Sequence, residues 1–106
     1  MDHLRIQTRS GLRQALGAGL FLLFKQSFRC PTSRRAFAEY EAFVGAHPDV
    51  PTGWIDVVAD RPLSLEAAEA TGVTHQSPQA ILIRDGAVTW HASHGAITAE
   101  SLAAAI

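Results

Sequence analysis

The stretch 20–33, with the sequence LFLLFKQSFRCPTS, decides the fold of this chain. It opens with a continuous apolar run, which is typical of a strand buried on both faces. A short polar loop follows, and then comes the only cysteine, Cys30, directly before Pro31. Beyond Pro31, Phe37 and Tyr40 begin a three- and four-residue apolar spacing that predicts a helix. The sequence therefore places a single thiol where a buried strand gives way to a helix.

This position favours a reactive sulfur. Proline suits the first helical position, because its missing N–H would have no partner inside the helix there. Cys30 would then lie at or next to the N-cap, where free N–H groups and the positive end of the helix dipole favour a thiolate. Arg29 adds positive charge beside it. The alternative is a buried and inert cysteine, which is common among lone thiols.

Composition restricts the classes of protein to consider. The chain has 106 residues, of which 47% are hydrophobic and 18% charged, and this suits one globular domain over residues 1–106. The formal net charge is −1 without a basic stripe, so nucleic-acid binding has no support. The apolar run 18–24 is too short to span a bilayer, and no signal-peptide cleavage pattern follows it. A single cysteine indicates a reducing, cytoplasmic setting or a reactive thiol.

Apolar patterning and turn residues give the order of the elements. We expect strands at 4–6, 20–24, 54–58, 80–83 and 88–93, and helices at 10–16, 31–45, 64–72 and 98–106. Ser10, Ser64 and Thr98 are the expected helix starts, and Asp85-Gly86 is a hairpin turn. The resulting order, β-α-β-α-β-α-β-β-α, predicts an α/β thioredoxin-like fold with a mixed central sheet flanked by helices.

The residues after Cys30 indicate monothiol chemistry. Ser33 stands where a Cys-x-x-Cys protein has its second cysteine. A dithiol protein resolves its own mixed disulfide, whereas this chain needs a second thiol from elsewhere. The pattern suits removal of a small thiol from a modified protein.

Several segments resemble the monothiol bacilliredoxin-like proteins of the bacillithiol system, the YtxJ type. They are Leu23-Phe24-Lys25, Arg29-Cys30-Pro31, Arg61-Pro62, 75–83 (HQSPQAILI), Asp85-Gly86, 90–94 (WHASH) and Ile97-Thr98. The family's usual segment around the thiol is Thr-Arg-Cys-Pro-Ile-Ser. Phe28 replaces its threonine and Thr32 its isoleucine, and these changes bear on substrate preference more than on the chemistry.

The resemblance implies thiol–disulfide exchange with bacillithiol as co-substrate and no cofactor. The partners it implies are bacillithiolated proteins and a low-molecular-weight thiol, and we expect a monomer or weak dimer. Cys30 is the expected nucleophile. In this fold the Ser77–Pro78 bond is cis and lies against the cysteine, so the Ser77 backbone can pair with an extended substrate. The expected substrate-binding residues are Phe28, Arg29, Pro31, Thr32, Ser33, His75, Ser77 and Pro78.

Other polar residues carry weaker expectations. His91 and His94 are three apart on a predicted strand and so face opposite sides, and we expect no metal site. Asp56 interrupts an apolar strand. It is either a buried acid beneath the thiol or, as we expect, a residue that points outward or meets a partner at the strand end.

Three other functions remain open. One is a glutaredoxin-like monothiol protein that uses another small thiol. The second is an iron–sulfur carrier, with Cys30 and a bound thiol as ligands in a dimer. The third is a thioredoxin-like binding module with an inert cysteine.

Overall fold

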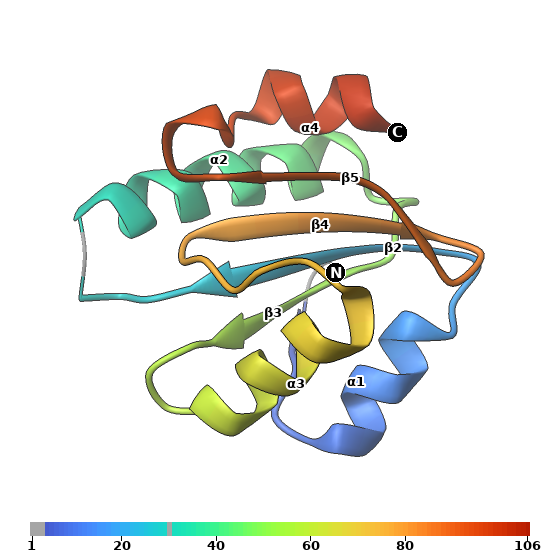
Figure 1. Cartoon of the computed structure of the whole chain (residues 1–106). Helices are drawn as coiled ribbons and strands as arrows, with labels where there is room; N and C mark the ends of the chain where they lie inside the picture. Colours follow the sequence, from blue (N-terminus) through green and yellow to red (C-terminus); the bar gives the residue numbers. More distant parts are fainter. Residues whose placement is uncertain (1–3, 30) are drawn as a thin grey trace.

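A mixed sheet with the strand order β1-β3-β2-β4-β5 forms the centre of the molecule (Figure 1). The computed structural model describes residues 4–29 and 31–106, apart from the Leu4 side chain. The elements of these residues, in chain order, are β1 (Leu4–Arg5), α1 (Arg9–Leu16), β2 (Leu20–Gln26), α2 (Pro31–Ala46), β3 (Thr52–Asp56), α3 (Arg61–Thr71), β4 (Gln79–Arg84), β5 (Ala87–Ser93), the 3-10 turn η1 (His94–Ala96) and α4 (Ala99–Ala105). The predicted α/β order is confirmed.

β2 is the central strand and is buried on both faces, as its apolar run predicts. It pairs with β3 in parallel and with β4 antiparallel. Phe21 and Leu23 pack into a core with α1 and α3, whereas Leu22 and Phe24 pack into a second core with α2 and α4. Figure 1 shows α2 and α4 on one side of the sheet and α1 and α3 on the other. Alternation along one strand thus supplies both cores.

Two predicted helix starts are wrong. The N-cap of α1 is Thr8, not Ser10, because the extended Thr8 accepts a 3.0 Å hydrogen bond from the Gly11 N–H on its side-chain oxygen. Helix α3 begins at Arg61, three residues before the predicted start at Ser64, with a proline in its first turn. Ser64 is buried inside the helix.

The last helix start is as predicted. Thr98 caps α4 through a reciprocal pair of hydrogen bonds with Ser101, each between a side-chain oxygen and a backbone N–H. Such a capping box satisfies two backbone donors that the helix leaves without partners. Thr98 lies two residues after the end of the short 3-10 turn η1.

The β4–β5 hairpin also turns where the sequence predicts. Asp85 and Gly86 both have positive φ angles, 53° and 83°, as a type I′ turn requires. An irregularity after Leu82 shifts the register within the hairpin. As a result, Val88 and Trp90 pack against opposite cores although they are two residues apart.

Within the described residues, we find no helix that is both long and apolar enough to cross a bilayer.

Gly53 tests the packing of Ile6 and Phe21 against β3. A Cβ added there would lie 3.0 Å from both Ile6 Cδ1 and Phe21 Cζ. We expect Gly53→Ala to lower the free energy of unfolding by about 1–3 kcal/mol, the usual cost of overpacking a core. Gly45→Ala is the matched control, because a Cβ on this α2 residue meets nothing within 4 Å. It should raise stability by about 0.5–1 kcal/mol. Urea unfolding measures both, and equal effects would contradict the packing described.

Candidate active site

The loop between β2 and α2 is the part of the chain that carries the thiol. Helix α2 begins at Pro31, as predicted. Cys30 itself lies outside the described residues, so its exposure and its contact with Pro78 stay predictions. Its neighbours in sequence, Arg29 and Pro31, are exposed, and so are Phe28 and Thr32. These four side chains are therefore accessible to a substrate.

Ser33 does not fit its predicted role in substrate binding. Its side chain is fully buried. The hydroxyl accepts a 3.0 Å hydrogen bond from the Ser27 N–H and donates a 3.3 Å bond to Gln26 Oε1. Residue 33 faces inward because it lies on the side of α2 that packs against the sheet. The serine therefore holds the β2–α2 loop in place, and a substrate cannot reach it.

Phe28 is the exposed member of an aromatic cluster whose other two members are half-buried. Its ring packs edge-on against Phe37 at 5.4 Å and against Trp54 at 5.5 Å, measured between ring centroids. We call Phe28, Phe37 and Trp54 the aromatic rim. Phe28 is 44% exposed although it belongs to this cluster. The rim thus offers a fixed apolar surface directly beside the thiol loop.

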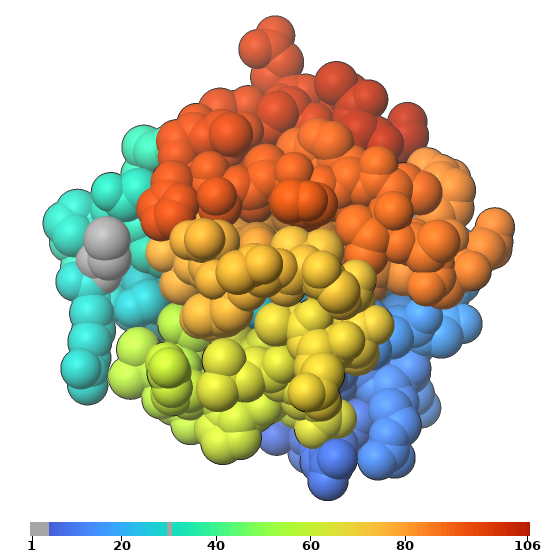
Figure 2. All heavy atoms as spheres, in the orientation of Figure 1, coloured from blue at the N-terminus to red at the C-terminus, as the bar shows by residue number. Residues whose placement is uncertain are grey.

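The segment before β4 approaches the same end of the sheet. The Ser77–Pro78 peptide bond is cis. Pro78 is buried, and Ser77 and His75 are half-buried. The next residue, Gln79, pairs with Lys25 of β2. Figure 2 shows the segment before Pro78 exposed between α3 and β5. The structure thus brings the predicted residues of this segment close to the end of β2.

His94 supports this segment from the other side of the hairpin. Its backbone N–H donates a 3.1 Å hydrogen bond to the Pro78 carbonyl. This bond is made by the backbone, so the role of the His94 imidazole stays a prediction. His91 lies in β5 and His94 in the 3-10 turn. Among the described residues, no three histidine, cysteine or acidic side chains form a group that could hold a metal ion.

Lys25 is a residue at this end of the sheet that the sequence reasoning missed. It is the only lysine in the sequence and is fully buried in the central strand. Its Nζ lies 3.2 Å from His75 Nδ1. Burial lowers the pKa of Lys25 from 10.5 to about 8. The signal was available, because Lys25 continues the alternation of Phe21 and Leu23, whose side chains face a core.

The environment of His75 also disfavours positive charge. Burial lowers the pKa of His75 below its ordinary value, and the charges of Lys25 and Arg61 lower it further. Lys25 reaches His75 from β2, and Arg61 acts on it from the first turn of α3. Lys25 and Arg61 therefore act on His75, which lies in the connection between α3 and β4.

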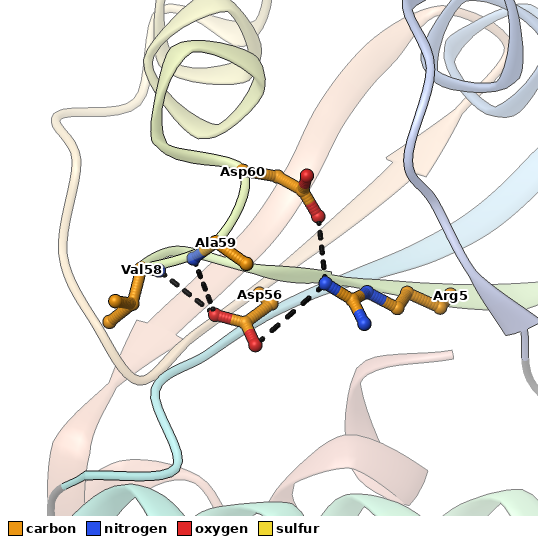
Figure 3. Close-up of polar contacts among 5 residues, drawn as sticks. All are labelled: Arg5, Asp56, Val58, Ala59 and Asp60. Carbon is orange, nitrogen blue, oxygen red and sulfur yellow. Dashed lines mark hydrogen bonds and ion pairs between the residues drawn. The ribbon is translucent and has the colours of Figure 1, made fainter.

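Asp56 is half-buried rather than a buried acid, and Figure 3 shows its carboxylate directed toward Arg5 and the backbone of Val58 and Ala59. It ends β3, and its Oδ1 accepts hydrogen bonds from the N–H groups of Val58 (2.9 Å) and Ala59 (3.0 Å). Its other oxygen lies 3.9 Å from Arg5 Nη2, which also donates a 3.1 Å bond to Asp60. The expectation that Asp56 meets a partner at the strand end is confirmed.

Comparisons with known proteins agree with this geometry. Residues 6–102 match the family model described as monothiol bacilliredoxin BrxC. A solved structure described as a candidate oxidoreductase with a thioredoxin fold is 29% identical, over 97% of this chain and 92% of its own, with a TM-score of 0.89.

Two thioredoxins support the fold alone. Thioredoxin from Trypanosoma brucei brucei is 14% identical, over 95% of this chain and 84% of its own, with a TM-score of 0.78. Mitochondrial thioredoxin 3 from Saccharomyces cerevisiae is 16% identical, over 96% and 91%, with a TM-score of 0.74.

The buried lysine predicts an unusual dependence of stability on pH. Between pH 8 and 10.5 the unfolded chain keeps the Lys25 proton and the folded chain loses it, so stability rises with pH in this window. We expect the free energy of unfolding of wild type, relative to Lys25→Met, to be flat below pH 7 and to rise by about 2 kcal/mol by pH 10. Urea unfolding across this range measures the difference.

Arg84→Gln is the control for loss of a positive charge, because Arg84 is exposed at the end of β4. Its stability relative to wild type should not change between pH 8 and 10. A flat difference for Lys25→Met would show that the lysine carries no unusual burial cost.

Proposed function

This chain belongs to the monothiol bacilliredoxin BrxC family, and we propose that it removes bacillithiol from protein mixed disulfides with Cys30 as the nucleophile. The family makes it a monothiol thiol–disulfide oxidoreductase of the bacillithiol system. One observation carries the residue assignment: the sequence holds a single cysteine, directly before the first residue of α2. Exchange chemistry in this chain has no other sulfur to use as a thiolate nucleophile.

The reaction has two exchange steps. The Cys30 thiolate attacks the bacillithiol sulfur of a protein mixed disulfide, and a new disulfide joins Cys30 to bacillithiol. The protein sulfur leaves as a thiolate and takes up a proton. A second small thiol then attacks as its thiolate, forms a disulfide with bacillithiol and releases the Cys30 thiolate. Each step exchanges one disulfide for another, so no cofactor is required.

The described residues support both steps. Helix α2 begins at Pro31, and the free N–H groups and positive dipole end of a helix N-terminus favour a thiolate on a cysteine next to it in sequence. Ser33 keeps the loop in place but contributes no thiol, so the second step needs an external one. Bacillithiol is the co-substrate that the family supports, and we propose that the protein works in the cytoplasm, where small thiols keep cysteines reduced.

The aromatic rim and the Ser77–Pro78 segment are the proposed contacts for the modified protein. The exposed Phe28 ring can cover apolar side chains beside the modified cysteine. The Ser77 backbone can pair with an extended segment of the substrate. Arg29 and Thr32 are exposed beside the thiol loop and can contact the small thiol.

The single thiol predicts a stable adduct. With oxidised bacillithiol, wild type should accumulate one adduct per chain, and Cys30→Ser should accumulate none. Ser33→Cys should lose the adduct and form an internal disulfide, because its thiol is only three positions after Cys30 and an internal attack does not require that residue 33 be reached by a substrate. Ser33→Ala is the matched control, since it removes the same hydroxyl without adding a thiol, and it should keep the adduct. Intact mass before and after reduction separates these products.

The proposal fails if wild type forms no adduct, or if Cys30→Ser still removes bacillithiol from a protein. Adduct formation with oxidised glutathione but not with oxidised bacillithiol would reassign the small thiol.

Phe28→Ala tests the aromatic rim. We expect kcat/KM to fall about fivefold for a bacillithiolated protein, because an aromatic contact contributes about 1 kcal/mol. The rate with oxidised bacillithiol alone should change less than twofold. Leu65→Ala is the control, because Leu65 is similarly exposed, at 43%, on α3. Equal losses with both substrates would contradict a role for Phe28 in recognising the protein, and thermal unfolding checks that each variant is folded.

A further inference from the structure

The contact between Lys25 and His75 constrains which nitrogen of the imidazole carries a proton. A lysine ammonium has three donors and no acceptor, whereas a neutral imidazole has one donor and one acceptor nitrogen. Nζ lies 3.2 Å from Nδ1, so a protonated Lys25 must donate and Nδ1 must accept. The proton of neutral His75 is then on Nε2.

The same contact opposes a second proton on the ring. Protonation of Nδ1 would turn a donor toward the ammonium, and two positive charges would meet in a partly buried place. The charged groups that act on His75 are Lys25 from β2 and Arg61 from α3, and both are cations. His75 has no carboxylate partner among the described residues. Its imidazole is therefore held neutral at the pH values where an ordinary histidine titrates.

The Nε2 edge of the ring is the one left toward the surface. Lys25 is fully buried and holds Nδ1 from inside, while His75 is half-buried. His75 lies two residues before Ser77 and three before Pro78, in the segment that ends at the strand pair Lys25–Gln79. An uncharged N–H donor therefore stands at the edge of the proposed substrate site.

We propose that Lys25 is a positioning residue that fixes His75 as a neutral Nε2–H donor, and that this donor hydrogen-bonds an acceptor of the bound mixed disulfide. The proposal rests on the proposed function for its substrate. The acceptor class is a carbonyl or carboxylate oxygen beside the disulfide, either in the protein backbone or in the small thiol. Because the donor is uncharged, its contribution does not vary through neutral pH.

Nitrogen-15 NMR of the wild-type protein tests the tautomer without any substrate. His75, assigned by its loss in His75→Gln, should show an unprotonated Nδ1 and a protonated Nε2 from pH 5.5 to 7.5. In Lys25→Met, His75 should become protonated within this range. Arg84→Gln, which removes an exposed cation on β4, should leave the His75 spectrum unchanged. A protonated Nδ1 in wild type overturns the proposal, and this state is observed in the wild-type spectrum itself.

Exchange rates with a bacillithiolated protein test the role of the donor. His75→Ala should lose about fivefold, and His75→Gln should recover to within twofold of wild type, because an amide keeps an uncharged N–H donor. The ratio of the wild-type rate to the His75→Ala rate should stay constant from pH 5.5 to 7.5. In the Lys25→Met background the same ratio should change as His75 takes up its proton.

An unaltered rate in His75→Ala overturns the substrate role. This result and a protonated Nδ1 in wild type are both distinct from failure of the proposed function. That failure would appear as absence of a Cys30 adduct in wild type.

Discussion

The enclosure of β2 is the constraint on which the rest of the structure depends. This strand is paired along both edges and covered by a core on each face. Each residue of the strand therefore has a fixed direction, and its end is held where the thiol loop begins. Burial of apolar side chains on both faces also stabilises the fold enough to offset the cost of burying the positive charge of Lys25. A strand at the edge of the sheet could not hold Lys25 away from water in the same way.

The same strand links the parts of the active site. Its last residues lead into the loop with Phe28, its pairing with β4 fixes the segment behind Pro78, and its one basic side chain reaches His75. Helix α2 is connected back to β2 through Ser33 and Gln26. The site is thus assembled from segments distant in sequence, and each is tied to one rigid element. Such an arrangement can position the reacting groups for thiol–disulfide exchange although the chain has no second cysteine.

Much of the fold could be predicted because its signals are local. The apolar run at 20–24, the Asp85-Gly86 turn and the threonine before α4 each act over a few residues. Helix starts were less predictable where several polar residues could act as the cap. Thr8 and Ser10 are both good N-cap residues, and only the extended backbone at Thr8 decides between them.

The segments that form the site could be predicted from the sequence, but the directions of their side chains could not. The thiol loop and the Ser77–Pro78 segment follow from the order of elements, and the sequence resemblance connects them. The Ser33 side chain faces inward because of the way α2 packs against the sheet, and no local sequence pattern specifies that packing. The contact of Phe28 with Trp54 depends on the pairing of two strands. Lys25 was overlooked because a charge is usually solvated, although the alternation of its neighbours points inward.

The buried lysine also affects how this protein can be handled chemically. It provides the only side-chain amine in the sequence, and it is fully buried. Acylating reagents, amine-directed crosslinkers and lysine acetyltransferases therefore find no side-chain target on the folded surface. Trypsin can cleave the folded protein after arginines, but it can cleave after Lys25 only when the central strand opens. Labelling of Lys25 would thus report opening of the sheet at its centre, and a single modified residue would serve as a probe of global unfolding.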